Sequence, residues 1–197
     1  MRIKKLLYVT AAVLACAFIS SCDTAKSVSQ AVSLVNCSYD LDGVANPMLG
    51  GISLANVTDP SQLSAADLLK ITAYLAQGKL PIAATVNIKA SNPNVVAAAL
   101  ENLEWAIDLK GKQLLQGMIS QPVNIPGKGS TTIPFTIQTD LMELTKDHSK
   151  DDLINLALNL VNAGEASSDV SVRIKPTVMI GTYPFSTGFI KLDKLIK

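Results

Sequence analysis

The fold is decided by residues 80–117, which read LPIAATVNIKASNPNVVAAALENLEWAIDLKGKQLLQG. Apolar and polar residues alternate along two segments of this stretch, one before and one after an Asn-Pro-Asn turn. A period of two is typical of strands that bury one face. The sequence therefore predicts two strands that face each other across the turn. Their predicted buried faces carry Ile82, Ala84, Val86 and Ile88 in the first strand, and Leu103, Trp105, Ile107 and Leu109 in the second.

Two turns punctuate this stretch. Asn92 precedes a proline, which favours an extended backbone, so the first strand can run up to it. Pro93 fixes φ at the next position, while Asn94 tolerates unusual backbone angles and can bond neighbouring amides. After the second strand, Lys110-Gly111-Lys112 predicts a short glycine hairpin.

These motifs carry a family resemblance. A strand that ends in Asn92-Pro93-Asn94, an alternating strand, a hairpin centred on Gly111 and a further glycine at Gly117 resemble the group 2 late embryogenesis abundant (LEA type 2) family. Its domain is also called the water-stress and hypersensitive-response (WHy) domain. The segment IPGKGST at residues 125–131 is similar to the family's turn before an outer strand. The resemblance covers roughly residues 80–192. It implies a small immunoglobulin-like or fibronectin III-like antiparallel β-sandwich, without enzymatic activity and linked to desiccation and envelope stress.

The rest of the chain predicts further strands and about two additional helices, in a mainly β domain over residues 33–197. The helices are expected near residues 64–77 and 151–163, and Ser64 caps the first. An alternating strand contains Pro134, which cannot donate a ladder hydrogen bond and therefore marks an edge strand or a bulge. The predicted apolar stripe of the first helix comprises Leu68, Leu69, Ile71, Tyr74 and Leu75.

The N-terminus has the features of a targeting segment. Three basic residues are followed by the apolar run Leu6–Ile19, which is shorter than the ~20 residues of a comfortable membrane span. The run ends in Ile19-Ser20-Ser21-Cys22, which resembles a bacterial lipobox and makes Cys22 the expected site of lipidation. The alternatives are a plain signal peptide or an uncleaved anchor. Cys16 is a competing site that would leave a shorter apolar run.

This pattern predicts a lipoprotein signal peptide at residues 1–21 and a tether at residues 22–32. The mature protein is then lipid-anchored in the bacterial cell envelope, at the outer membrane or the periplasmic face. Cleavage removes three basic residues and changes the formal net charge from +1 to −2. Nucleic-acid binding is not expected, because phosphate contacts need clustered lysine and arginine.

No constellation for chemistry emerges from the sequence. His148 is the only histidine and falls in a polar loop, so neither a metal site nor a catalytic triad is expected. Residues 127–131 hold a GKGST run, but a phosphate-binding loop needs a helix after it and a strand is predicted here. Asp151 and Asp152 favour a helix start, and Trp105 falls on the core parity of its strand. The sequence predicts no catalytic residue, metal, cofactor or small-molecule substrate.

If Cys16 is removed with the signal peptide and Cys22 is lipidated, Cys37 is the remaining free cysteine of the mature protein. It shares one parity with Val35 and Tyr39 in a predicted first strand over residues 33–41. Free cysteine is commonly a small buried hydrophobe, so this role is favoured over a reactive thiol.

Two functions follow as hypotheses. The first is a tethered stress-protection or binding module that contacts membranes or client proteins through its surface. The second is a structural or adaptor subunit of an envelope complex, which would bind a partner protein through an exposed sheet edge such as the strand of Pro134. A third hypothesis, a hydrolase, is disfavoured. Turnover that a point mutation at one acidic or serine residue abolishes would support it.

Overall fold

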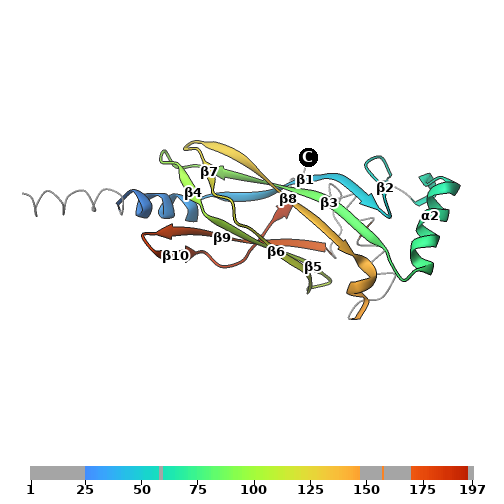
Figure 1. Ribbon diagram of the computed structural model, residues 1–197. Coiled ribbons are helices and arrows are strands. Elements are labelled where there is room, and N and C mark those ends of the chain that lie inside the picture. Colours follow the sequence, from blue (N-terminus) through green and yellow to red (C-terminus); the bar gives the residue numbers. More distant parts are fainter. Residues whose placement is uncertain (1–24, 58–59, 147–156, 158–169, 195–197) are drawn as a thin grey trace, which may run out of the picture.

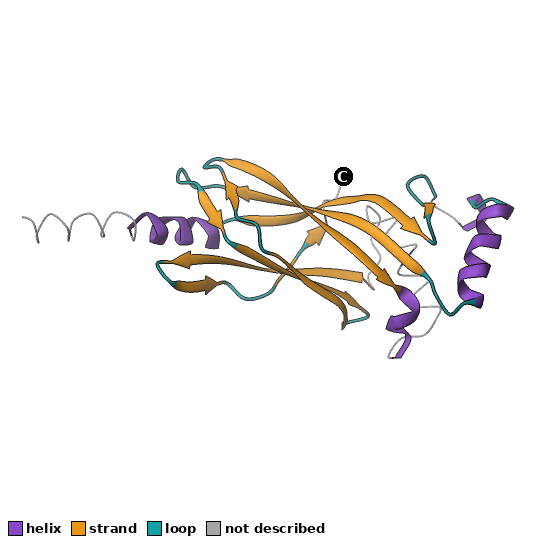
Figure 2. Ribbon diagram, in the orientation of Figure 1, coloured by secondary structure: helices purple, strands orange, loops and turns teal. Residues whose placement is uncertain are grey.

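Two sheets face each other and enclose the main core (Figures 1 and 2). The computed structural model describes residues 25–57, 60–146, 157 and 170–194. Strand order is β12-β1-β3-β8 in the first sheet, with β2 beside β1, and β10-β9-β5-β6 in the second, with β11 beside β9. All pairings are antiparallel except β1 with β12, so the predicted mainly antiparallel β-sandwich with helices is confirmed.

The strands have the following bounds. The first sheet contains β1 (Ser38–Leu49), β2 (Ile52–Ser53), β3 (Pro81–Asn92), β8 (Gly129–Asp140) and β12 (Asp193–Lys194). The second contains β5 (Asn102–Leu109), β6 (Lys112–Ile119), β9 (Val170–Ile180), β10 (Tyr183–Ser186) and β11 (Ile190–Lys191). A separate pair joins β4 (Ala98–Leu100) to β7 (Val123–Ile125).

The two strands of the deciding stretch are β3 and β5, and they belong to different sheets. β3 pairs with β1 and β8, whereas β5 pairs with β6 and β9. The predicted alternation is confirmed in β3, where every second residue from Ile82 to Asn92 is buried. In β5 it holds only in part: Trp105 is half-buried, while Ala106 and Asp108, which have the opposite parity, are buried, and the register with β6 shifts between Ile107 and Asp108. The two strands do face each other, but across the core and with no ladder between them, because β4 and its connections lie between them in the chain. The hairpin at Lys110 and Gly111 joins β5 to β6 as predicted.

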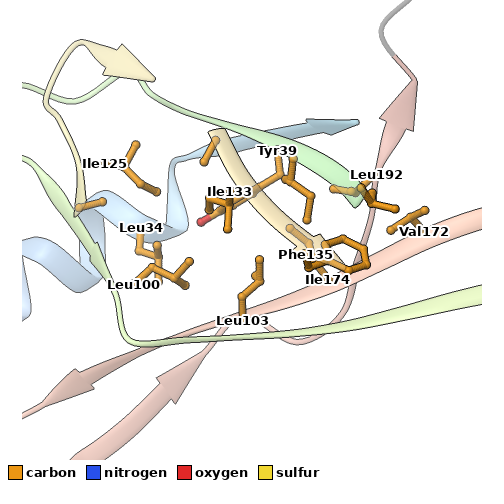
Figure 3. Packing of buried hydrophobic residues seen from close by; sticks show 14 of the residues in the cluster. Leu34, Tyr39, Leu100, Leu103, Ile125, Ile133, Phe135, Val172, Ile174 and Leu192 are labelled. Atoms are coloured by element: carbon orange, nitrogen blue, oxygen red, sulfur yellow. The ribbon is translucent and has the colours of Figure 1, made fainter. Parts of the chain in front are cut away.

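The main core is filled from both sheets and from the N-terminal helix (Figure 3). Its members include Val86, Ile88, Ile133, Phe135 and Ile137 from the first sheet, Leu103, Ile107, Val172, Ile174 and Val178 from the second, and Ala31 and Leu34 from residues 25–35.

Tyr39 is the polar exception in this core. Its side chain is 6% exposed, and no described group hydrogen-bonds to its hydroxyl. Burial, with a smaller contribution from Cys37, raises the pKa of Tyr39 above its usual range.

Replacing Tyr39 by phenylalanine is expected to raise the free energy of unfolding by about 1 kcal/mol, because the buried hydroxyl loses its hydrogen bonds to water on folding and gains no hydrogen bond within the protein. Urea unfolding of the two proteins measures the change. Tyr183→Phe is the matched control, since Tyr183 is exposed and should show no difference. A loss of stability in Tyr39→Phe would contradict the conclusion that the Tyr39 hydroxyl has no hydrogen-bond partner.

Residues 25–35 form a helix, so the prediction of a tether over residues 22–32 is wrong for its described part. The strand predicted over residues 33–41 begins later and runs further, because the chain stays helical to residue 35 and β1 extends from Ser38 to Leu49. The reason is packing: Ala31 and Leu34 lie one turn apart and both enter the main core. Serine and glutamine between the apolar residues concealed this contact in the sequence.

The helix α2 (Ala65–Ala76) forms where it was predicted. The Ser64 hydroxyl accepts the amide of Asp67, whose carboxylate reaches back to the Ser64 amide, which completes a capping box. Its apolar stripe is not buried as expected, and Leu69 is 72% exposed. Only Ile71 of the stripe packs against the second core cluster, which is centred on Leu54, Leu109 and Leu141. The second predicted helix, at residues 151–163, lies outside the described residues apart from Ala157, which is helical and buried.

Pro134 lies in the middle of β8, and β8 is the outer strand of its sheet, as predicted. The β3–β8 register runs without a shift from Pro81 with Asp140 to Asn92 with Gly129. An unbroken ladder around Pro134 indicates that its missing donor falls on the side away from β3.

Candidate functional site

The Asn-Pro-Asn turn is a hydrogen-bonded junction at the end of β3. The Asn92 side chain is buried, and its Nδ2 donates to the carbonyls of Val96 (2.9 Å) and Ile125 (3.2 Å). Its Oδ1 accepts the backbone amide of Asn94 at 3.0 Å and the Asn94 side-chain amide at 2.9 Å. Asn92 therefore makes the turn, by an Asx-type bond to the residue two positions on. Asn94 itself does not adopt the unusual positive φ that its residue type permits.

Asn94 connects this turn to the N-terminal helix. Its Nδ2 also donates to the carbonyl of Ser33 at 3.1 Å, and its Oδ1 accepts a long bond of 3.4 Å from Asn36. Carbonyls in the last turn of a helix lack partners within the helix. The Asn94 side chain supplies one, and so fixes the end of the helix to the sandwich.

The second motif turn, at residues 125–129, closes on the first. The Lys128 amide donates to the Asn94 carbonyl at 2.7 Å. A Cβ at Gly127 would lie 2.0 Å from the Val95 carbonyl oxygen, so only glycine fits there. We call residues 33–36, 92–96 and 125–129 the motif junction. Its polar groups bond to one another, which gives the motifs a structural role.

A shallow hollow of about 480 Å³ lies beside the motif junction. Its charged members are Lys89 and Lys128, and Asp40 lies across from Lys89 in the β1–β3 register. The remaining lining is Asn36, Ser38, Ser91, Asn92, Pro93, Gly129 and Ser130. These groups offer hydrogen-bond donors and acceptors. The GKGST run forms the turn into β8, so the expected strand follows it and a phosphate-binding loop is ruled out.

A second hollow, of about 440 Å³, opens between the outer strands β6 and β8. Trp105 stacks on Phe135 along its floor, with ring centroids 4.5 Å apart. Gly117 pairs with Trp105 across the ladder, and a Cβ there would come within 2.3 Å of the indole ring. Trp105 is half-buried against the main core, as its parity predicted. This explains physically why a glycine sits at position 117.

The two outer strands at this hollow, β6 and β8, differ in how well their unpaired edges could bind another strand. The edge of β8 lacks a donor at Pro134. In β6, Lys112 is the only charged residue, there is no proline, and β5 is its only paired strand among the described residues. Long uncharged edges can accept an added strand, whereas proline and charge discourage one. The strand of Pro134 was predicted as a candidate binding edge, and by these criteria the edge of β6 is less protected than that of β8.

A polar cluster on the second sheet was not found from the sequence. Arg173 on β9 forms a two-point ion pair with Asp108 on β5, with Nη2 to Oδ1 at 2.8 Å, and lies 4.9 Å from the Phe189 ring centroid. The hydrogen bonds that Arg173 donates to the Asp108 carboxylate raise the pKa of the Arg173 guanidinium. Lys175, further along β9, forms an ion pair with Glu104, the residue directly opposite it on β5, at 2.8 Å. These pairs connect β5 to β9, and only the three-dimensional register could reveal them.

Cys37 has the properties of a structural cysteine. It packs against the main core, and its Sγ lies 3.3 Å from the Ser33 carbonyl as a weak donor. Burial raises the pKa of the Cys37 thiol from 9.0 to about 11.

Labelling of Cys37 by a disulfide reagent is expected to be on the order of 10-fold slower than for a thiol of ordinary pKa at pH 8. Two pKa units reduce the thiolate fraction about 100-fold, and the greater nucleophilicity of the more basic thiolate offsets about tenfold of this. The rate should keep rising with pH up to about 11. The urea-unfolded chain is the control, and a native rate equal to the unfolded rate would contradict the assignment.

Several predicted residues lie outside the described part of the chain. They are the lipobox residues Ile19, Ser20, Ser21 and Cys22, and also His148, Asp151 and Asp152. Within the described residues, no three His, Cys, Asp or Glu side chains form a group that could hold a metal ion. No helix there is long and apolar enough to span a bilayer.

Comparison with known protein families gives one match. The family model described as "Late embryogenesis abundant protein" matches residues 87–187, a little more than half of the chain, including both motif turns. No curated protein sequence matches significantly.

Three solved structures resemble the chain at low identity. A protein from Archaeoglobus fulgidus is 18% identical, with 58% of this chain and 87% of that chain covered and a TM-score of 0.34. A "putative late embryogenesis abundant (LEA) protein" is 15% identical, with coverage of 94% and 90% and a TM-score of 0.36. A protein from Arabidopsis thaliana is 20% identical, with coverage of 56% and 70% and a TM-score of 0.31. On the family match over both motif turns, the chain belongs to the group 2 late embryogenesis abundant family.

Proposed function

We propose that this protein is a non-enzymatic, lipid-anchored protein of the bacterial cell envelope, whose sandwich acts as a stress-protection or binding module. The family match is the observation that carries the proposal. Members of the family are stress-related and generally without enzymatic activity. Desiccation and envelope stress are the conditions to test.

The described surface supports action by contact rather than by chemistry. The polar side chains of the motif junction are bonded to each other, and those on β5 and β9 form ion pairs. Membranes and labile client proteins are partners suited to such a surface, because neither requires a reactive group.

The anchor is supported by the sequence motif at Ile19-Ser20-Ser21-Cys22. A diacylglyceryl group on Cys22 contributes ~0.8 kcal/mol for each buried CH₂, so two or more chains hold a protein stably. The folded domain then begins within a few residues of the membrane, because the helix is already formed at Ala25.

The test is protection of a labile enzyme during drying and rehydration. The enzyme is dried with the purified protein, without residues 1–22, or with an inert protein of the same mass, over a series of ratios. Recovery of activity well above that with the inert protein is the expected result. Recovery equal to the inert protein would reject stress protection and shift support to the second function.

The second candidate is an adaptor subunit that binds a partner strand at β6. The observation in its favour is the uncharged edge of β6 beside the hollow of Trp105 and Phe135. A photo-crosslinking residue at Met118, exposed on β6, should capture one defined partner in cells, whereas the same residue at Leu69 on α2 should not. Absence of any adduct specific to Met118 would reject this function.

A further inference from the structure

The N-terminal helix carries an exposed apolar face. Val28, Val32 and Val35 are 44%, 58% and 50% exposed. At about 100° per residue these three positions lie within about 60° of each other around the helix. We call them the valine face. By the same measure Leu34 lies about 130° and Ala31 about 70° from the centre of this face, and both enter the main core, so the helix is apolar on both its packed and its free sides.

Packing on the sandwich supports only half of this helix. The sequence AKSVSQAVSLV is rich in serine and valine, which are weak helix formers, and a segment this short is marginal as an isolated helix. The buried residues Ala31, Ser33 and Leu34 all lie in its second half, while residues 25–30 hold none. The first half therefore has no fully buried residue, although Ser27, Ser29 and Gln30 are half-buried, and a surface that covers the valine face would add to its packing.

The position of the helix indicates what that surface is. Cys22 precedes Ala25 by three residues, which span at most about 11 Å when extended. Lipid on Cys22 would place the bilayer surface within reach of the helix. The carboxylate of Asp23 lies next to the anchor, but from residue 24 to residue 39 Lys26 is the single charge, so the helix itself presents no carboxylate to anionic headgroups. Valine beside a basic residue is suited to the headgroup boundary.

We propose that the valine face lies in the headgroup region of the membrane that holds the anchor. The helix is then an interfacial element, and the motif junction, which binds its C-terminal end, fixes the sandwich relative to the bilayer. In this orientation α2, at the opposite end of the molecule, is directed away from the membrane (Figure 1). The proposal rests on the Cys22 anchor of the proposed function.

The test uses the full chain, produced in a lipidating bacterium and reconstituted in vesicles of phosphatidylethanolamine with a minority of phosphatidylglycerol. An environment-sensitive fluorophore is attached at Val32→Cys, in a Cys37→Ala background. The matched control is Leu69→Cys on α2, which is exposed and apolar but lies at the other end. Lipids brominated near the headgroup should quench the label at position 32 about threefold more strongly than the label at position 69.

A second pair of variants separates insertion from mere proximity. Val28→Glu should reduce quenching at position 32, because a carboxylate is unfavourable at an anionic lipid surface, while Leu68→Glu should leave it unchanged. Equal quenching at positions 32 and 69 in acylated protein would overturn the proposal. Self-quenching at position 32 that increases with protein density, without quenching by bromolipid, would assign the face to a second copy and also overturn it.

A separate measurement tests whether Cys22 is lipidated. Mass spectrometry of the N-terminal peptide reports whether Cys22 carries acyl chains. An unmodified Cys22 would overturn the anchor and the orientation together, whereas an acylated Cys22 with a water-exposed label at position 32 would overturn the orientation alone.

Discussion

Asn92→Ala is expected to lower the free energy of unfolding by about 2–4 kcal/mol, because it removes four hydrogen bonds from a buried site. The Asn92 side chain is 2% exposed and donates to the carbonyls of Val96 and Ile125. Alanine would leave both acceptors without this donor. It would also remove the acceptor for both amides of Asn94, which in turn binds the helix at Ser33. A single side chain thus supports the turn, the second motif turn and the helix end.

Urea unfolding followed by Trp105 fluorescence measures this loss, since Trp105 is the only tryptophan. Asn36→Ala is the matched control at the same junction: Asn36 is exposed and makes one long bond of 3.4 Å, so its loss should stay below about 0.5 kcal/mol. Hydrogen exchange should also show faster opening of the helix amides in Asn92→Ala. Equal losses for the two variants would show that Asn92 is not the centre of the junction.

The sequence was sufficient to identify the Asn-Pro-Asn motif but not what it binds. Local rules predicted the end of a strand and a turn at residues 92–94, and both are present. The bond from Asn92 to Ile125 joins residues 33 positions apart, and the bond from Asn94 to Ser33 spans 61. No local pattern encodes such partners. The family resemblance indicated that the two motif turns occur together, and the geometry of the motif junction explains why.

Alternation predicted which side of β3 is buried and was only partly correct for β5, and it did not predict which sheet holds either strand. The period depends on one strand and its buried face, so it was correct for β3. Sheet membership depends on pairing with distant segments such as β8 and β9, and the predicted facing strands turned out to lie in opposite sheets. The edge position of Pro134 was predictable because a proline excludes a second ladder on its own side. The outer position of β6 among the described strands was not, since it depends on pairing with distant segments.

Helix prediction worked at α2 and failed at residues 25–35 for one physical reason. Capping is local, so Ser64 and Asp67 identified the start of α2. Burial is not local: the apolar stripe of α2 remains largely exposed, while Ala31 and Leu34 are buried within a segment that looked like a tether. The two helices lie at opposite ends of the sandwich (Figure 1), and each carries exposed apolar side chains, whose packing depends on what adjoins the domain.

Gly127→Ala is expected to cost about 2–4 kcal/mol, because the added methyl group meets backbone rather than a movable side chain. Its Cβ would lie 2.0 Å from the Val95 carbonyl oxygen and 2.6 Å from the carbonyl carbon. Relief requires the two motif turns to separate, which breaks the Lys128 to Asn94 bond. Thermal unfolding and urea midpoints measure the effect.

Gly129→Ala supplies the comparison for this change, two residues along the same turn. A Cβ there meets the Pro126 side chain at 2.8 Å, and a ring atom can shift more readily than a paired backbone, so the expected loss is nearer 1 kcal/mol. Gly127→Ala and Asn92→Ala both open the motif junction, so the double variant should lose less stability than the sum of the two single losses. Strict additivity, or equal losses at the two glycines, would mean that the turns are not one cooperative unit. Subadditive losses would establish that the family's two motifs stabilise a single contact, the one that fixes the N-terminal helix to the sandwich.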